Sequence, residues 1–367
     1  MKPSFLDSLK AFFNIKNNKF KITLLCLLLV YLLIIFKISL ARFNTTDTIP
    51  PFKAMTTEAL KQLGAFTVRV KVGLFVKSFP VFDAIKNTFL ADSIVWFEFN
   101  GDEIMIETID KFSFDNGRIT YKSPPDIKIV GSRIFVKYNV LFELKTDLNF
   151  KKFPFEDHRL PMMLSNDFVT PEEMVFVVDD SSFQVLPKVF PSGWKLADLS
   201  VDAGFTPLEL DKQDATKKSE NPKAFFILNF AKASGRKALI IFMPLFSAII
   251  LSLLSFLMSI GNIAGISAIV ITAVTALLGY RFVIEQMMPQ VGYFTTADSL
   301  YLFLLSSAFL ILFIQLLITR QHASLKGALE HDKKAVIGIA RIELLSSIIF
   351  IIMSLLLAAA TTYMILL

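Results

Sequence analysis

The hydrophobic positions gather into five long runs, and most polar positions lie in one block between the first run and the second. Each run is long enough to cross the hydrocarbon core of a bilayer, which takes about 20 residues. The runs are 22–41, 238–260, 263–284, 298–319 and 342–367. The block 42–236 has a length typical of one soluble domain. We therefore predict an α+β membrane protein: an N-terminal apolar helix, a polar domain, and a four-helix transmembrane bundle over 237–367.

The polar block reads as β structure. Runs of β-branched and aromatic residues, such as 67–76 and 134–145, alternate partly with polar residues, and turn residues such as Asn100-Gly101 separate them. Many short strands without a long helix between them predict a β-sandwich. A brief helix is expected at 56–63, and the polar run 211–223 is expected to form a loop or hairpin tip.

Charge indicates the sidedness of the chain. The loop 320–341 carries five basic residues against two acidic ones, and the flank 1–21 is rich in lysine. The positive-inside rule places both in the cytoplasm, so the polar domain is extracytoplasmic and the chain crosses the plasma (inner) membrane several times. The span 22–41 has two interpretations. The sequence Ser39-Leu40-Ala41 fits a signal-peptide cleavage site, whereas the long positive flank and Lys37 favour a retained signal anchor.

Composition narrows the function classes. The net charge of +6 fits lysine-rich membrane flanks, and no basic stripe interleaved with aromatics predicts nucleic-acid binding. The single cysteine, Cys26, lies in the first apolar run, so no disulfide is expected in the polar domain. No nucleophile elbow, phosphate loop or metalloprotease motif is present, and the histidines lack neighbouring metal ligands. We expect no enzyme activity, metal or cofactor.

The second helix of the predicted bundle has an uncommon face. Small or weakly polar residues recur there at steps of three and four, and large aliphatic residues such as Ile266, Val270 and Leu277 occupy the opposite side. The stripe consists of Ala264, Ala268, Thr272, Thr275, Gly279 and Phe282. It has two interpretations: the helix lines water as part of a pore, or its small face packs closely on a neighbouring helix.

Several short motifs, in a fixed order, resemble a known family. The stretch KTDLNFKKFPFEDHRLPMML (145–164) is similar to the signature loop of the pentameric ligand-gated ion channels, the Cys-loop receptor superfamily. Thr146 and Leu160 stand at the two cysteine positions, as in the cysteine-free prokaryotic branch, and Glu156 replaces the usual Asp. The other resembling elements are Pro125-Asp126-Ile127, Arg236 followed by Pro244 in the first bundle helix, and the linker MMPQVGYFTTADS (287–299).

The resemblance implies a homopentameric channel for ions, gated by a small-molecule ligand or by protons and lined by the helix 263–284. Movement would pass from the polar domain to the pore through coupling residues, and an aromatic pocket would hold the ligand. The coupling residues would be Phe153, Pro154, Phe155, Glu156, Asp157, Arg236 and Pro289, and the ligand-contact candidates are Phe97, Phe99 and Phe168.

One ion pair within that set is predicted specifically. The family pairs the arginine before the first bundle helix with the signature-loop acid, so Arg236 is expected to pair with Glu156, with Asp157 as a competitor. In the other interpretation Arg236 contacts lipid headgroups and Glu156 faces water. His158 in the same loop is either an ordinary solvated or hydrogen-bonded loop histidine or a proton sensor.

The stripe also departs from the family pattern. It has no charged ring at the cytoplasmic end, Thr275 stands where the family has Leu, and Phe282 is its one bulky residue. Five Phe282 side chains around an axis would form an apolar gate near the outer end. These departures leave an alternative, which is a non-conducting receptor or sensor of the same fold.

Overall fold

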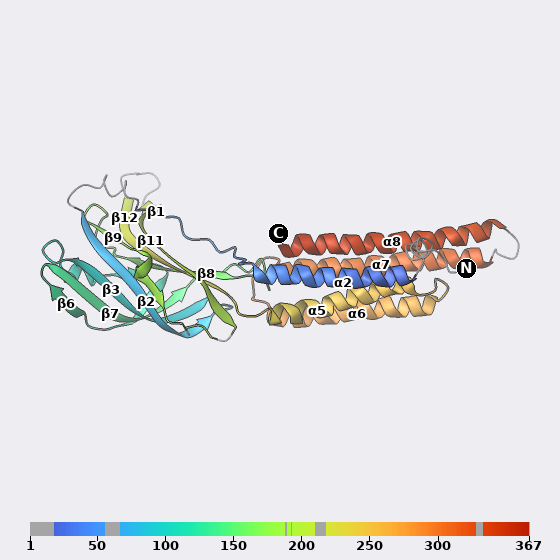
Figure 1. Cartoon of the computed structure of the whole chain (residues 1–367), viewed down its shortest axis with the longest axis horizontal. Helices are drawn as coiled ribbons and strands as arrows, with labels where there is room; N and C mark the ends of the chain where they lie inside the picture. Colours follow the sequence, from blue (N-terminus) through green and yellow to red (C-terminus); the bar gives the residue numbers. More distant parts are fainter. Residues whose placement is uncertain are drawn as a thin grey trace, which may run out of the picture. The chain divides into compact units, whose positions relative to one another are not determined.

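The structure is a computed structural model that describes residues 18–55, 67–187, 189–191, 193–209, 218–327 and 333–366. The chain divides into two compact units (Figure 1). The β unit comprises 43–149 and 156–234, and the helical unit comprises 1–42, 150–155 and 235–367. The hexapeptide 150–155 therefore leaves the β-rich block and belongs to the helical unit, which the sequence does not predict. The expected helix at 56–63 lies outside the described residues.

Two sheets make up the β unit. The five-stranded sheet has the order β1-β11-β12-β8-β4. The other sheet has the order β10-β2-β3-β7-β5, with β6 pairing β7 and β9 pairing β2. The first sheet consists of β1 (Lys53–Ala54), β4 (Ser113–Phe114), β8 (His158–Ser165), β11 (Trp194–Glu209) and β12 (Lys218–Lys232). The second consists of β2 (Val68–Asp83), β3 (Thr88–Asn100), β5 (Gly117–Lys122), β6 (Asp126–Val130), β7 (Arg133–Lys145), β9 (Met174–Val177) and β10 (Phe183–Val185).

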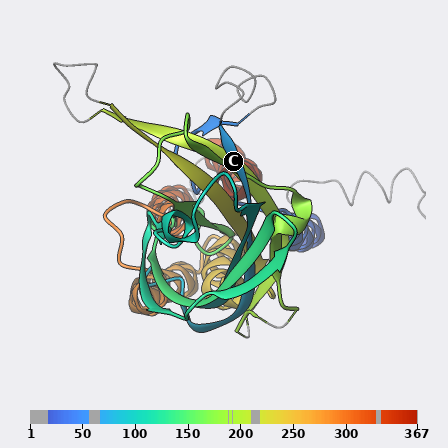
Figure 2. The ribbon, with the colours of Figure 1, turned by 90° about the vertical axis from the view of Figure 1, so that its left-hand side faces the viewer.

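Period-two alternation of side chains creates the core of the β unit. Along β3 every second residue is buried, from Phe89 to Phe99, because alternate side chains point to opposite faces of a strand. Rings from the two sheets meet inside: Phe114 of β4 stacks on Phe142 of β7 with centroids 3.9 Å apart. Figure 2 shows the strands curving around this interior. Two short helical turns, α4 (Ile106–Ile109) and η1 (Asp180–Ser182), join strands.

The predicted loop or hairpin tip at 211–223 is strand from Lys218 onward. Strand β12 begins at Lys218 and pairs antiparallel with β11, so 218–223 is strand. The cross-strand hydrogen bonds of a two-stranded extension satisfy the backbone even where the side chains are polar. The remainder, 211–217, lies outside the described residues.

In the part of the helical unit that the structure describes, five helices are long and apolar enough to span a membrane. They are α2 (Asn18–Ala41), α5 (Arg236–Leu254) with the short turn η2 (Ser255–Leu257), α6 (Ile263–Met287), α7 (Thr296–Gly327) and α8 (Lys333–Leu366). Helix α6 packs on α5 and α7, and α8 packs on α7 and α2 (Figure 1). Tyr31 and Thr362 join α2 to α8 through hydroxyl groups 2.6 Å apart. Helix α2 is thus packed as an additional member of the helical unit.

Candidate functional site

The hexapeptide 150–155 is a tightly turned loop whose aromatic side chains are all buried. Phe150, Phe153 and Phe155 are 3%, 1% and 4% exposed. The N–H of Phe153 donates to the carbonyl of Phe150 at 2.9 Å, and the N–H of Phe155 donates to the carbonyl of Lys152 at 2.7 Å. These two hydrogen bonds define two successive turns, and the three rings of the loop are buried.

The loop carbonyls cap the N-terminus of α7. The carbonyl of Lys151 accepts from the N–H of Thr296 at 2.8 Å and from its hydroxyl at 3.1 Å. The carbonyl of Phe153 accepts from the N–H of Ala297 at 3.0 Å. The first four N–H groups of a helix have no partner within it, and here two of them are satisfied by the loop. Displacement of the loop would therefore uncap α7.

The link between α6 and α7 contacts the same loop. The hydroxyl of Tyr293 accepts a hydrogen bond from the N–H of Phe150 at 2.9 Å. Pro289, which was predicted as a coupling residue, is buried in this link, directly after α6 ends. The structure thus places the loop and the α6–α7 link in direct contact, and the contacting residue, Tyr293, follows soon after α6 ends at Met287.

The loop also binds α5 and α2 through its rings. Phe155 stacks on Phe242 of α5, with centroids 5.2 Å apart and an angle of 15° between the rings, and meets Phe36 of α2 edge-on at 5.4 Å. The ammonium of Lys237 lies 4.7 Å from the centre of the Phe153 ring. Such aromatic pairs contribute about 0.5–1.5 kcal/mol beyond their buried area. The loop thus holds the end of α2, the beginning of α5 and the beginning of α7 together.

The acid that follows the loop pairs within the β unit. Glu156 lies 2.7 Å from the ammonium of Lys232, with side chains 4% and 12% exposed. Glu156 is therefore already paired within the β unit, and Arg236, which belongs to the helical unit, is exposed at the first turn of α5. The pair of Glu156 with Arg236 stays a prediction. Strands β8 and β12 are antiparallel with His158 opposite Phe230, and the same register brings positions 156 and 232 opposite each other. An exposed guanidinium has no desolvation cost that would require a carboxylate.

Asp157 ties three segments together through backbone hydrogen bonds. Its carboxylate accepts from the N–H of Asn44 at 2.8 Å and from the N–H of Lys232 at 3.0 Å. Its own N–H donates to the carbonyl of Asn44 at 2.6 Å. Burial raises the pKa of the Asp157 carboxyl, and the two N–H donors oppose that shift. Burial likewise lowers the pKa of Lys232, against the opposing attraction of Glu156.

His158 is fully buried and hydrogen-bonded, so of the two forms expected for an ordinary histidine here it is the hydrogen-bonded one, not the solvated one. Its Nδ1 lies 3.0 Å from Oδ2 of Asp47, and its ring packs against Trp194 and Phe230. Asp47 also accepts the N–H groups of Asn149 at 2.6 Å and Arg159 at 2.9 Å. Asp47 therefore holds both chain segments that flank the loop within the β unit. No pattern in the local sequence around Asp47 predicts this role.

The stripe on α6 faces away from the rest of its own chain. All six of its residues are exposed, and Phe282 is 69% exposed. On the opposite side Ile266, Val270 and Leu277 are 2%, 0% and 1% exposed. Among the described residues, the stripe therefore does not pack on another helix of the same chain, and close packing of its small face would need a helix from another copy.

A cluster of polar contacts fixes the C-terminal part of α6 to α7. Arg281 lies 2.6 Å from Asp298, and it also contacts Glu285 at 3.0 Å. Asp298 accepts from the N–H of Thr295 at 3.0 Å, while the hydroxyl of Thr295 accepts from the N–H of Asp298 at 3.3 Å. This is a reciprocal capping arrangement at the start of α7. The Thr-x-x-Asp spacing in the sequence is a signal for such a helix N-terminus, and the sequence-based prediction above does not include it.

The predicted ligand contacts do not come together. Phe97 and Phe99 are 0% and 3% exposed and lie in the core of the β unit, where Phe97 packs near Phe112 and Phe176. The prediction that these two residues contact a ligand is therefore withdrawn, because the alternation along β3 directs both rings into the core. Phe168 is 67% exposed and lies beneath the ammonium of Lys111 at 4.7 Å. It remains the one candidate of the three with an accessible ring.

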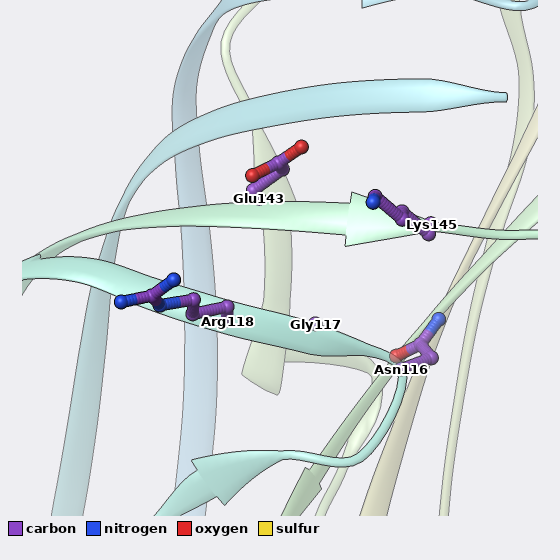
Figure 3. A pocket seen from close by; sticks show the side chains of 5 residues that line it. All are labelled: Asn116, Gly117, Arg118, Glu143 and Lys145. Atoms are coloured by element: carbon purple, nitrogen blue, oxygen red, sulfur yellow. The ribbon is translucent and has the colours of Figure 1, made fainter. Parts of the chain in front are cut away.

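The β unit also has a shallow polar cavity of about 430 Å³ at the β5–β7 strand pair. Figure 3 shows Arg118 on β5 and Glu143 with Lys145 on β7. Arg118 and Lys145 are exposed, and the lining residues include no aromatic ring. A group of solvated charges without an apolar wall lacks the features of a small-molecule pocket.

Comparison with known proteins adds no family assignment: no protein-family model matches the chain, and no curated protein matches it. Among the described residues no group of three or more His, Cys, Asp or Glu could hold a metal ion.

The raised pKa of Asp157 predicts a pH effect on stability. A carboxyl whose folded-state pKa lies above its ordinary value of 3.8 binds a proton more readily in the folded protein. Its contribution to the free energy of unfolding therefore increases as the pH falls through the raised pKa towards 3.8. We expect the wild type to gain stability relative to Asp157→Asn over that range, measured by denaturant unfolding in detergent.

Asp179 provides a comparison, because its pKa is shifted in the opposite direction to that of Asp157. The Lys71 ammonium holds the pKa of Asp179 well below its usual range, so this carboxyl loses its stabilising contribution as the pH falls below 3.8. The wild type should lose stability relative to Asp179→Asn there. A wild-type–Asp157→Asn difference that is independent of pH would contradict the role assigned to burial.

Proposed function

We propose that the protein is a homopentameric ligand-gated or proton-gated ion channel whose pore is lined by α6. The observation that carries the proposal is the exposed stripe of Ala264, Ala268, Thr272, Thr275 and Gly279 on a helix whose opposite face is buried. A helix in a membrane exposes bulky apolar side chains where it meets lipid, and small or weakly polar ones where it meets water or a closely packed partner.

The other apolar helices support this contrast. The exposed positions of α7 include Phe309, Phe313 and Leu317, and those of α8 include Ile352 and Leu355. These faces suit acyl chains. The hydroxyl of Thr272 donates to the carbonyl of Ala268 at 2.7 Å. Because this hydroxyl already has a partner within α6, it is compatible with a narrow pore. Symmetric rings are the usual way for one such helix to enclose water.

The coupling route of the proposal runs through the loop 150–155. In this reading the β unit is an extracytoplasmic β-sandwich of a protein in the plasma (inner) membrane, and a ligand or protons alter the contact between neighbouring copies. The loop contacts the α6–α7 link at Tyr293 and caps α7 at Thr296. A movement of the loop would change how α6 is held at its C-terminal end. Phe168 and the hairpin of β11 and β12 would contribute to the ligand pocket.

A second candidate is a non-conducting receptor of the same fold. The N-terminal end of the stripe exposes Asn262 and Ala264 and carries no charged side chain, whereas a ring of like charges is one of the means by which a channel selects ions. Ile271 and Leu278 are 52% and 47% exposed beside the stripe and add apolar surface to that side. In this candidate the coupling loop would report ligand binding to a partner without ion flow.

The test begins with the copy number. We expect the full chain in mild detergent to have the mass of five copies by native mass spectrometry, since one α6 cannot enclose a pore. After reconstitution in a planar bilayer, stepwise acidification and small amines should produce discrete conductance steps. A monomer or tetramer would remove the basis of the pore, and a stable pentamer that is silent under all these conditions would favour the second candidate.

A further inference from the structure

A polar pocket of about 360 Å³ lies within the helical unit, at the end where α2 begins. Four segments line it: the start of α2, the turn 256–260 between α5 and α6, the C-terminal part of α7, and the N-terminal part of α8. Its polar side chains are Asn18, Lys21, Ser259, His322, Glu343, Ser346 and Ser347. A polar cavity at the end of five apolar helices corresponds to the headgroup level of a bilayer.

The donors contributed by α2 are held in place by the turn between α5 and α6. Lys21 is only 6% exposed, and its ammonium donates to the carbonyl of Phe256 at 3.0 Å. The amide of Asn18 donates to the carbonyl of Leu257 at 3.2 Å. An ammonium has three N–H donors, and the carbonyl uses one of them. Lys21 is therefore both oriented and able to donate to a bound anion.

The opposite wall carries the opposite charge. Glu343 of α8 lines the same pocket as Lys21, and its neighbours on α8, Ser346 and Ser347, are 2% and 1% exposed. Ser347 donates its hydroxyl to the carbonyl of Glu343 at 2.9 Å, which supports the first turns of α8. The pocket thus presents a cation from α2 and an anion from α8, and His322 of α7 also lines it.

A ligand that complements this pocket must itself carry both charges. A phosphate would be bound by Lys21 and Asn18, and a primary ammonium would donate N–H groups to Glu343. A purely anionic headgroup would place its only charge near Glu343, and a quaternary ammonium has no N–H to donate. We propose that this pocket binds the phosphoethanolamine headgroup of a membrane phospholipid. Bound there, the lipid would join α2 to α8 and to the turn that leads into α6.

The experiment uses the purified full chain after removal of endogenous lipid. Phosphatidylethanolamine, phosphatidylglycerol and phosphatidylcholine with identical acyl chains are added separately, and retained lipid is counted by native mass spectrometry. We expect retention of phosphatidylethanolamine to exceed that of the other two by about tenfold in apparent affinity, the weight of one charge-assisted hydrogen bond. Competition with free O-phosphoethanolamine distinguishes a lipid-only site from one that also accepts the soluble compound.

Three variants locate the site. Lys21→Met should lose about tenfold in affinity for phosphatidylethanolamine, and Glu343→Gln should lose the preference over phosphatidylglycerol. Lys19→Met is the matched control, because Lys19 is an exposed lysine on the same turn of α2 and does not line the pocket. Equal retention of the three lipids by the wild type would overturn the proposal, as would equal losses in Lys19→Met and Lys21→Met. The measurement does not depend on ion conduction, so a silent protein can still bind the lipid.

Discussion

Replacement of Lys232 by Met is expected to destabilise the protein by about 3–5 kcal/mol, because it leaves the buried carboxylate of Glu156 without its partner. The two groups are 2.7 Å apart and 12% and 4% exposed, so water cannot replace the lost ammonium. Trp194 provides a local reporter, since the Lys232 ammonium lies 5.9 Å from the centre of its ring. The measurement is denaturant unfolding of the full chain in detergent, followed by tryptophan fluorescence.

The double variant Glu156→Gln with Lys232→Met should recover part of the loss, because it removes both charges from the buried site. Lys77→Met is the matched control: the ion pair of Lys77 with Asp92 is 2.7 Å long, but its side chains are 30% and 37% exposed. Exposed pairs of this kind contribute only about 0–1 kcal/mol. Similar losses in Lys232→Met and Lys77→Met, or a double-mutant cycle without coupling, would disprove the structural role of the Glu156–Lys232 pair.

The sequence predicts the helices well because hydropathy reports them directly. The expected run 263–284 corresponds to α6 at Ile263–Met287. By contrast, α7 continues to Gly327 and α8 begins at Lys333, beyond the expected 298–319 and 342–367. Hydropathy falls where a helix leaves the apolar layer, whereas the backbone hydrogen bonds continue. The period of the stripe likewise predicts which side of α6 is exposed, since a helix repeats every 3.6 residues.

The contacts around the loop depend on information that local patterns do not contain. The pairing of Glu156 with Lys232 follows from the register of β8 and β12, and that register is set by the whole sheet. Asp47 lies in an irregular segment, yet it bonds to His158 and Arg159, more than a hundred residues away. The alternation along β3 predicts that Phe97 and Phe99 are buried. The family resemblance instead implies a ligand contact, because it depends on their aromatic character.

Phe282→Ala is expected to raise the resting conductance of the reconstituted protein by about tenfold or more, which corresponds to a barrier lowered by about 1.4 kcal/mol. Phe282 is the bulky member of the α6 stripe, and its side chain is 69% exposed in the single chain. Five such rings around an axis would exclude water from the pore, and Ala would leave room for it. Thr275→Leu should act in the opposite direction, because it adds an apolar ring to the middle of the stripe.

Phe313→Ala on α7 tests whether the effect belongs to the stripe. Phe313 is 60% exposed, but its neighbours Leu310, Leu316 and Leu317 form a bulky apolar face that suits lipid. Truncation there should leave conductance unchanged. Because neither phenylalanine is buried in its own chain, both variants should unfold at nearly the wild-type denaturant concentration, so a conductance change cannot be attributed to loss of folded protein. If Phe282→Ala forms pentamers, reaches the membrane and conducts no more than Phe313→Ala, the α6 stripe does not gate a pore, and the non-conducting receptor becomes the better account of this fold.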